Sequence, residues 1–301
     1  MIKYALSLDG GGVRCIAALT FLNILEKELK QNVSDLFDYY AGTSSGGISS
    51  IGIGSVAMNT SEMLEMWNPK NAERIMQSES WQGGLGLSLM RGKPKYNPAG
   101  KREVLQDYFG GLTFKESKKP VAVTAYDIED RSPLLLSSYE NGNLKLVEVA
   151  EATSAAPTFF PTAEVNGKYL IDGGVVDNNP AMNAYIEALK IYPKDTIKVL
   201  SIGTGLNRRK INGKASKEWG LFGWMTHDLL GIMTETSLQN KLAEDLIGKN
   251  YLRINSPLGK CKRKLDDISI KNINNIKDMG KVWWDTFGEQ TLNLLSEIRV
   301  K

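Results

Sequence analysis

A short run of glycines around one serine constrains this chain most. Residues 37–54 pass from an aromatic, strand-like stretch into a helix of small residues through Gly42-Thr43-Ser44-Ser45-Gly46. In a Gly-x-Ser-x-Gly turn, glycine on either side lets strand and helix pack so closely that the serine hydroxyl projects beyond the sheet edge. The pattern predicts Ser44 as a nucleophile, although by itself it fits a glycine-rich turn with a solvated serine equally well.

A second glycine run follows the first strand. The strand-like residues 4–8 lead into the loop 9–14, which has three consecutive glycines, and residues 16–30 carry apolar side chains at helical spacing. Glycines leave backbone N–H groups uncovered, and the following helix adds its positive dipole, so the loop suits a developing negative charge. Neither glycine run fits a nucleotide-binding loop, because Cys15 replaces the third fingerprint glycine and Ile48 replaces the phosphate-loop lysine.

An aspartate at a strand end is the second candidate. Residues 169–171 form a short strand followed by Asp172 and two glycines, and a helix is expected over 181–190. Reacting groups gather at the carboxyl ends of parallel strands, so Asp172 would lie beside Ser44 if their strands run in the same direction. Many Asp-Gly pairs only stabilise turns, and that interpretation stays open. Asp177 and Asn178 fit helix capping better.

Strands and helices alternate along the whole chain. Beyond those already named, the patterns predict strands at 121–126, 134–138 and 199–202 and helices at 61–74, 101–109 and 225–247, with a last amphipathic helix around 283–295. This alternation predicts an α/β fold with a mainly parallel sheet. We expect one domain over 1–301, with the chemical motifs within 1–205 and a helical part of open role over 206–301.

Composition excludes several classes. The chain has 301 residues, 42% of them hydrophobic, enough for one large core. Cys15 and Cys261 have neither metal-binding spacing nor a disulfide framework, which favours a reducing compartment. We find no apolar run of about 18 residues and no signal-peptide pattern, and therefore expect a soluble, cytoplasmic protein. A net charge of +3 is too small to indicate a nucleic-acid polymer as partner.

Three segments suggest contact with lipid. Residues 80–97 mix glycine with apolar side chains, as a lid would, although an irregular stretch over the core fits too. The aromatic pair at 159–160 follows small residues and is expected to form an apolar wall. The tryptophan-rich residues 219–224, after a basic stretch at 208–214, resemble an interfacial membrane contact. A solvated basic loop is the simpler interpretation of that stretch.

Taken together, four segments at 9–14, 42–47, 154–161 and 172–180 resemble, in order, those of bacterial patatin-like phospholipases. The resemblance covers about the first 200 residues. It implies a three-layer α/β fold and hydrolysis of lipid acyl esters without metal or cofactor. It further implies that Ser44 is the nucleophile and Asp172 its base in a catalytic dyad. The family commonly has glycine where this chain has Cys15, so the start of the first helix departs from its pattern.

The same resemblance extends to the groups around the dyad. The glycine loop would supply the oxyanion hole, formed by Gly10, Gly11, Gly12 and Arg14. A lipid substrate also needs an apolar groove for its acyl chain, and the side chains available to line one include Phe159, Phe160, Leu87 and Met90. The expected partner is a phospholipid membrane surface, with peripheral association during activity.

Other functions stay open. The single histidine, His227, follows Ser44 and Asp172 in the chain order of α/β-hydrolase triads, although it lies within an expected helix. A non-catalytic lipid-binding module is a further alternative. Some bacterial patatin-like proteins are antiphage effectors switched on by a cyclic nucleotide, and residues 208–210 (Arg-Arg-Lys) carry charge suited to such an anion. The sequence sets no oligomeric state.

Overall fold

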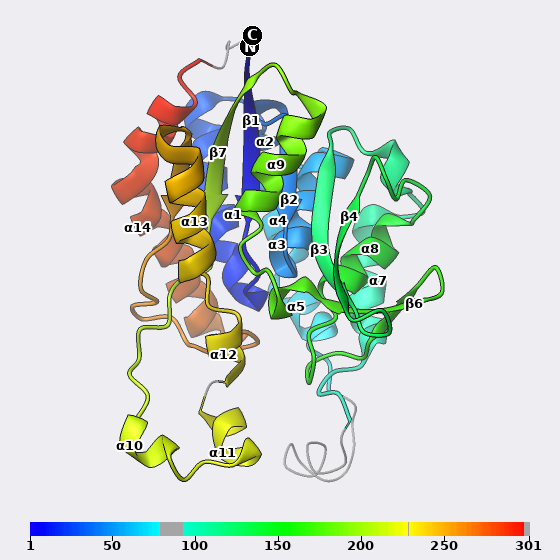
Figure 1. Cartoon of the computed structure of the whole chain (residues 1–301), viewed down its shortest axis with the longest axis vertical. Helices are drawn as coiled ribbons and strands as arrows, with labels where there is room; N and C mark the ends of the chain where they lie inside the picture. Colours follow the sequence, from blue (N-terminus) through cyan, green and yellow to red (C-terminus); the bar gives the residue numbers. More distant parts are fainter. Residues whose placement is uncertain (79–92, 228, 298–301) are drawn as a thin grey trace.

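A single mixed β-sheet forms the centre of the molecule, for which the computed structural model describes residues 1–78, 93–227 and 229–297 (Figure 1). Its strands lie in the order β5-β6-β3-β2-β1-β7-β8, with β4 also paired to β3. The parallel pairings join β1 (Ile2–Leu8), β2 (Tyr39–Gly42), β3 (Val121–Asp127), β7 (Thr196–Ile202) and β8 (Tyr251–Ile254). Antiparallel pairings add β4 (Ser132–Ser137), β5 (Ala163–Val165) and β6 (Lys168–Asp172). The predicted mainly parallel sheet is confirmed.

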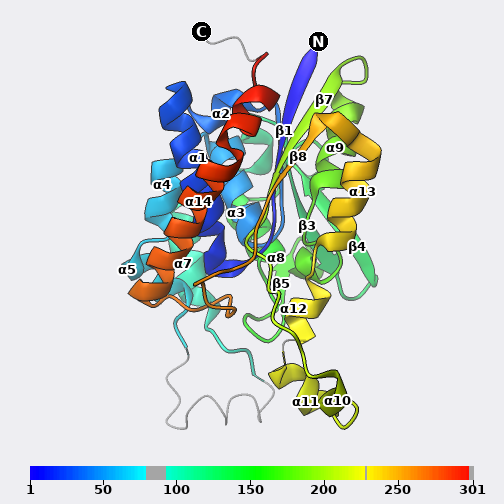
Figure 2. The same cartoon turned by 90° about the vertical axis from the view of Figure 1, so that its left-hand side faces the viewer.

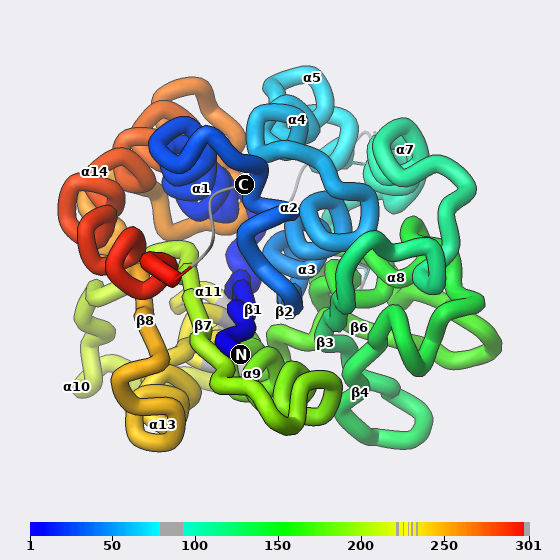
Figure 3. Tube along the Cα trace, turned by 90° about the horizontal axis from the view of Figure 1, so that it is seen from above, coloured from blue at the N-terminus to red at the C-terminus, as the bar shows by residue number. Residues whose placement is uncertain are grey.

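Helices cover both faces of this sheet. Seen edge-on, α1 (Cys15–Leu29), α3 (Ser45–Ser50) and α14 (Ile270–Leu294) lie on one side, and α9 (Ala181–Ile191) and α13 (Ser237–Ile247) lie on the other (Figure 2). The view along the strands shows α1 beside α14 on their shared face (Figure 3). The fold thus has three layers, as expected.

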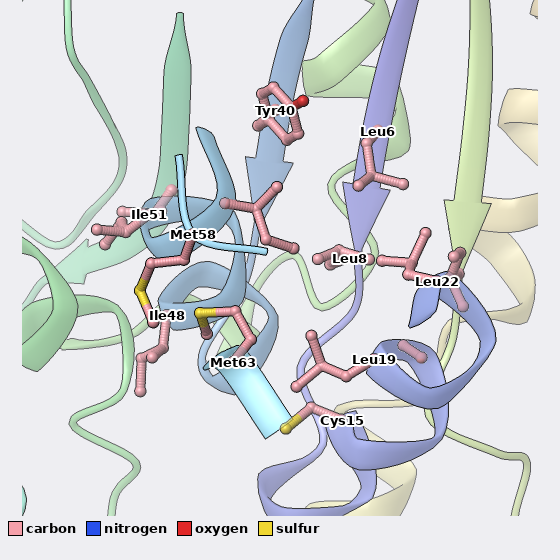
Figure 4. Packing of buried hydrophobic residues seen from close by; sticks show 14 of the residues in the cluster. Leu6, Leu8, Cys15, Leu19, Leu22, Tyr40, Ile48, Ile51, Met58 and Met63 are labelled. Atoms are coloured by element: carbon pink, nitrogen blue, oxygen red, sulfur yellow. The ribbon is translucent and has the colours of Figure 1, made fainter. Parts of the chain in front are cut away.

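Both faces of strand β1 are covered by helices, and the residues Tyr4–Leu8 are buried. On one face, Leu6 and Leu8 pack with Leu19 and Leu22 of α1 in the main core (Figure 4). On the other face, Ala5 belongs to a cluster that includes alanines of α9, namely Ala181, Ala184 and Ala188. Small side chains on both surfaces let α9 approach the sheet closely.

Three neighbouring strands end at one edge. Leu8 at the end of β1 is in register with Gly42 at the end of β2 and with Ile202 at the end of β7. The glycine loop after β1 and the serine elbow after β2 therefore leave the sheet side by side. This edge is where the candidate site forms.

Two expected helices are divided. The helix predicted at 61–74 is two helices, α4 (Thr60–Met66) and α5 (Pro69–Ile75), because Asn68 caps a new start directly before a proline. The prediction of one long helix over 225–247 is also wrong.

The stretch predicted as that long helix contains α11 (Leu221–Thr226), α12 (Leu229–Met233) and α13. The carbonyl of Thr234 accepts a hydrogen bond from the Asn178 side chain, 3.0 Å away. The side chain of Glu235 accepts from the backbone N–H of Ser237. These contacts take the backbone around Thr236 out of the helical pattern.

The remaining predicted helices are confirmed with small shifts of their ends, except that the last one, α14, begins at Ile270, well before the expected residue 283. They are α1, α9, α14 and α7 (Pro98–Phe109). Short helices that the sequence did not indicate separately are α2 (Val33–Leu36), α8 (Leu146–Thr153) and α10 (Gly213–Ser216), together with a π-helical turn, η2 (Ile51–Val56), that extends α3.

Candidate active site

Ser44 lies on a strained turn between β2 and α3. Its backbone has φ 56° and ψ −125°, a left-handed conformation that side-chain-bearing residues rarely adopt. A Cβ added at Gly42 would stand 2.3 Å from the carbonyl oxygen of Gly46, and one at Gly46 would stand 2.3 Å from that of Leu8. Both glycines are therefore required for the close approach that the sequence predicted. The N–H of Ser44 donates to Thr153 Oγ1 at 3.0 Å, which fixes the turn.

Asp172 lies at the end of β6 and its side chain contacts Ser44. The residue is 5% exposed, its Oδ1 accepts a 2.8 Å hydrogen bond from the N–H of Gly174, and its carboxyl lies close enough to the Ser44 side chain for that side chain to lower its pKa. Burial raises the pKa of Asp172 to about 6, and hydrogen bonds from Ser44 and Gly174 oppose that rise. The structure thus brings the two candidates into direct contact.

The expectation that the strands before Ser44 and Asp172 run in the same direction is wrong. Strand β6 is antiparallel to β3, which is parallel to β2, so the strands before Ser44 and Asp172 run in opposite directions. Asp172 is paired with Ala125 of β3, and Gly42 at the end of β2 is paired with Val123 of the same strand. The end of the short β6 therefore lies level with the carboxyl edge of the parallel strands. Register and strand length place Asp172 here, rather than strand direction.

The glycine loop passes directly over Ser44. A Cβ added at Gly10 would stand 3.2 Å from the Cβ of Ser44. The carbonyl oxygen of Gly10 accepts hydrogen bonds from Thr204 Oγ1 at 3.0 Å and from Asn178 Nδ2 at 3.3 Å. Gly12 has φ 55°, and a Cβ there would stand 2.2 Å from the carbonyl oxygen of Leu265. The loop is held by segments from three other parts of the chain.

Only some of the loop's N–H groups are available to a ligand. The amide of Gly10 donates to Asn178 O at 3.2 Å, and the amide of Arg14 donates to Gly11 O at 3.2 Å. Within residues 1–78, 93–227 and 229–297, the amides of Gly11 and Gly12 have no hydrogen-bond acceptor. Both residues line the same cavity as Ser44, so two free donors lie in the wall of the candidate site.

Two residues expected as helix caps have other roles. Asn178 bridges the glycine loop and Thr234, as described above, and Asp177 Oδ2 accepts a 2.7 Å hydrogen bond from Asn183 Nδ2. The start of α9 is instead held by Asn179, whose side-chain oxygen accepts from the N–H of Ala181 at 3.2 Å. Burial, with the nearby charge of Asp9, raises the pKa of Asp177 to about 7.

An apolar cavity opens from the Ser44–Asp172 contact. Phe159 and Phe160 line it as predicted, and the ring of Tyr96 packs against both, with centroid distances of 6.4 and 5.6 Å. Leu87 and Met90 lie outside the described residues. Helices α4, α5 and α7, with the residues that end α4 and α5, supply part of the other apolar lining, which includes Met66, Trp67, Ile75, Met76 and Leu105.

His227 belongs to a different contact group. Its ring stacks on Trp219 with centroids 3.8 Å apart, and its Nδ1 lies 2.7 Å from the carbonyl oxygen of Gly223. It is exposed and is absent from the described lining of the cavity that holds Ser44 and Asp172. The structure therefore does not assemble the Ser44-Asp172-His227 triad.

Comparison with known protein families identifies relatives of this chain. The family model described as patatin-like phospholipase matches residues 6–185. The chain belongs to the patatin-like phospholipase family. Lipid acyl hydrolysis is accordingly the class of reaction of this protein, as the resemblance implied.

Relatives of this patatin-like protein occur in plants and bacteria. Patatin-like protein 3 of Arabidopsis thaliana is 29% identical over 92% of this chain and 79% of its own length. A protein of Pseudomonas aeruginosa named cGAMP-activated phospholipase is 31% identical over 92% of this chain and 86% of its own length. The crystal structure of VipD from Legionella pneumophila aligns with a TM-score of 0.47 and 14% identity, over 94% of this chain and 67% of that one.

Sequence reasoning missed two cations that stand behind the site of this patatin-like protein. Lys101 on α7 is 4% exposed and lines the cavity. Its helical spacing from the buried Val104 and Leu105 was a signal that it faces the core. Arg253 on β8 forms a buried ion pair with Asp9, beside the glycine loop. A charged residue inside a four-residue strand was its only local signal.

Residues 208–227 stand apart from the cavity wall. Arg208, Arg209 and Lys210 are exposed, and α10 and α11 project beyond the carboxyl end of the sheet (Figure 1). The rings of Trp219 and Trp224 meet edge to face at 5.4 Å. No described part of the chain gathers three metal-binding side chains. Nor does any helix in the described residues have the length and apolarity to cross a membrane.

Proposed function

We propose that this protein releases fatty acids from membrane phospholipids through a Ser44–Asp172 dyad. The observation that carries the proposal is the contact of a serine on a strained elbow with a buried carboxylate, beside two unused amides. A serine hydroxyl needs a neighbouring base during attack, and such positioned base catalysis contributes about 10²- to 10⁴-fold. Asp172 is the carboxyl group beside that hydroxyl.

The reaction proceeds in two stages. Asp172 takes the proton of Ser44 while Oγ attacks the ester carbonyl carbon, and the amides of Gly11 and Gly12 hold the resulting oxyanion. Collapse of the tetrahedral intermediate breaks the ester bond, and Asp172 gives its proton to the departing alcohol. Water then attacks the acyl-enzyme with Asp172 again as the base, which releases the fatty acid and restores Ser44.

The apolar lining of the cavity is suited to a lipid acyl chain. Phe159, Phe160 and the apolar residues of α4, α5 and α7 give the chain a nonpolar environment, which is favourable because apolar surface leaves water. Arg14 lines the same cavity beside the free amides, where its charge favours the oxyanion. We infer that the cavity binds the acyl chain of the ester that Ser44 attacks.

Labelling and product analysis test this function. Wild-type protein should react with a fluorophosphonate at Ser44 and release fatty acid and lysolipid from phosphatidylglycerol vesicles. Ser44→Ala should lose both activities, whereas Ser49→Ala on the same helix should keep both, because the Ser49 hydroxyl only bonds the Ser45 carbonyl. Labelling without any hydrolysis across a panel of phospholipids and neutral lipids would contradict the proposal. Lipid binding with neither labelling nor hydrolysis would support the non-catalytic alternative.

Membrane docking is proposed for the aromatic and basic segment. Five cations at Arg208, Arg209, Lys210, Lys214 and Lys217 precede Trp219 and Trp224, on a part of the chain that projects from the site end of the sheet (Figure 1). Basic residues next to aromatic ones favour an anionic bilayer surface. The proposal is a cytoplasmic enzyme that binds membranes peripherally. Co-sedimentation with anionic vesicles should fall with added salt and with Trp219→Ala.

Activation by a cyclic nucleotide is proposed from one relative. The Pseudomonas aeruginosa protein named cGAMP-activated phospholipase supports it, as does the exposed cluster Arg208, Arg209 and Lys210. On this proposal the enzyme is an effector of bacterial antiphage defence. Cyclic di- and trinucleotides should raise fatty-acid release, and the rise should vanish in a triple alanine variant of the cluster. High activity that none of them changes would contradict regulation of this kind.

We also propose that residues 1–301 form one domain. Strand β8 pairs with β7 in the central sheet, and α14 packs along α1. The part after residue 205 therefore completes the sheet and its cover. Expression of residues 1–205 alone should give an unfolded or aggregated product, and a folded, active fragment would contradict the proposal.

A further inference from the structure

The buried ammonium of Lys101 stands in the wall of the candidate site. Its Nζ donates to the carbonyl oxygen of Ser154 at 3.0 Å and to Ser154 Oγ at 3.2 Å, and it lies 3.9 Å from the centre of the Phe160 ring. These contacts satisfy the ammonium without neutralising it. A charge removed from water in this way is costly, so its presence here calls for a role.

No carboxylate in the described residues forms an ion pair with Lys101. The nearest acid along α8, Glu151, pairs with Arg102 at 3.0 Å. Burial lowers the pKa of the Lys101 ammonium to about 8, and the charges of Glu151 and Asp172 oppose that shift. Lys101 and Asp172 line the same cavity, in which little water screens the attraction.

A short backbone segment also connects the two residues. Ser154 receives both hydrogen bonds from Lys101, and the next residue, Ala155, accepts a 3.1 Å hydrogen bond from the N–H of Asp172. Lys101 thus anchors the segment that holds the Asp172 backbone. Lys101 thus acts on Asp172 in two ways, through its charge and through this backbone segment.

Other charges near the site have partners elsewhere. Asp9 is paired with Arg253. Asp266 is paired with Lys95. The remaining charged group in the described lining of the cavity is Arg14 at the glycine loop. Among all of these, Lys101 is the group whose charge stabilises the ionised form of Asp172.

We propose that Lys101 is a positioning residue for the dyad: its buried ammonium keeps Asp172 in the ionised, proton-accepting form and fixes the Ser154–Ala155 segment behind it. The inference rests on the proposed function of Asp172 as base. Removing the charge should move the acid limb of the kcat/KM profile to higher pH by about one unit, since a nearby opposite charge shifts a carboxyl by about that much or more. Above about pH 8.5 Asp172 is ionised either way, and the effect should vanish.

The test compares variants across pH. Lys101→Met keeps the length and apolar stem of the side chain, Lys101→Arg keeps the charge, and Lys118→Met removes one exposed charge as a control. Relative to wild type, Lys101→Met should lose roughly 5- to 10-fold in kcat/KM for a soluble ester near pH 6, and less than about two-fold near pH 9. The acid limbs of Lys101→Arg and Lys118→Met should match the wild type.

Two results would overturn the inference. One is an acid limb for Lys101→Met that coincides with the wild type, and the other is a loss of equal size at every pH, which a purely structural role would produce. If Lys101→Met does not fold, the pH dependence of fluorophosphonate labelling of Lys101→Gln gives the same comparison. Asp172→Asn separates the two proposals: its full activity would refute the dyad, whereas its inactivity with an unshifted Lys101→Met limb would refute only the role of Lys101.

Discussion

The guanidinium of Arg253 holds the carboxylate of Asp9 through two hydrogen bonds, Nη1 to Oδ1 at 2.7 Å and Nη2 to Oδ2 at 2.5 Å. The Asp9 side chain is buried and that of Arg253 is 9% exposed, and Arg253 also donates to Ser201 Oγ at 2.7 Å. Asp9 directly precedes the glycine loop over Ser44. A strand from the C-terminal part of the chain thereby fixes the backbone that would receive the oxyanion.

Breaking this ion pair should destabilise the fold. Arg253→Met leaves the Asp9 carboxylate buried without a partner, which costs about 3 to 5 kcal/mol of unfolding free energy. The double variant Asp9→Asn/Arg253→Met removes both charges and should recover much of that loss. Urea denaturation measures all three proteins. A double variant no more stable than Arg253→Met would contradict this account of the pair.

The stability of the protein should depend on pH through Asp172. Burial raises the pKa of its carboxyl from 3.8 to about 6, so the folded state binds this proton more tightly than the unfolded state does. The stabilisation from this proton is complete below about pH 4 and is lost as the pH rises through about 6. Asp172→Asn should therefore exceed the wild type in unfolding free energy near pH 8 by up to about 3 kcal/mol, with the difference shrinking near pH 4.5.

Urea denaturation at the two pH values tests the sign of this effect. Asp285→Asn on the exposed side of α14 is the matched control and should leave the wild-type stability unchanged at both values. An Asp172→Asn variant that is less stable than wild type near pH 8 would refute the assignment of a raised pKa.

The elbow should depend on Thr153. Thr153→Val keeps the side-chain shape but removes the acceptor for the Ser44 N–H, and a buried donor without a partner costs about 1 to 3 kcal/mol. We expect kcat for fatty-acid release to fall about ten-fold, because the Ser44 hydroxyl is no longer held in the orientation for attack. KM should change little, because the apolar cavity is intact. Thr286→Val, whose hydroxyl bonds only within α14, should behave as wild type. Unchanged kcat in folded Thr153→Val would show that the elbow does not need this bond.

The glycine loop should tolerate no side chain at Gly12. Gly12→Ala combines φ 55° with a contact of 2.2 Å to the Leu265 carbonyl, so the loop must shift and its amides with it. Loss of one oxyanion donor costs about 10²- to 10³-fold in kcat. Gly111→Ala, where an added Cβ meets nothing within 4 Å, is the control. Hydrolysis by Gly12→Ala within a few-fold of wild type would argue against the oxyanion role.

Residues that act through local geometry were predictable from sequence. Ser44 and the glycines around it specify their own turn, and the strand-loop-helix order puts the glycine loop at the same sheet edge. Asp172 was found for a partly wrong reason, because the sequence indicated a strand end but not the direction of β6. Local sequence patterns therefore identified Ser44, the glycine loop and Asp172, but not the strand arrangement that brings Ser44 and Asp172 together.

Residues that act through distant partners were not predictable. Arg253 meets Asp9 across 244 positions of the chain, and Asn178 meets Gly10 across 168. Local sequence patterns carry no signal for contacts between residues so far apart in the chain. The break in the expected helix 225–247 has the same origin, since the carbonyl of Thr234 is engaged by the side chain of Asn178.

The most direct measurement is fatty-acid release from phospholipid vesicles by the wild type, Asp172→Asn and His227→Ala, each shown to be folded and each assayed with and without cyclic nucleotides. A dyad without histidine predicts that Asp172→Asn loses at least about 100-fold, while His227→Ala stays within about two-fold of wild type. Loss of activity in His227→Ala with Asp172→Asn left active would contradict the account.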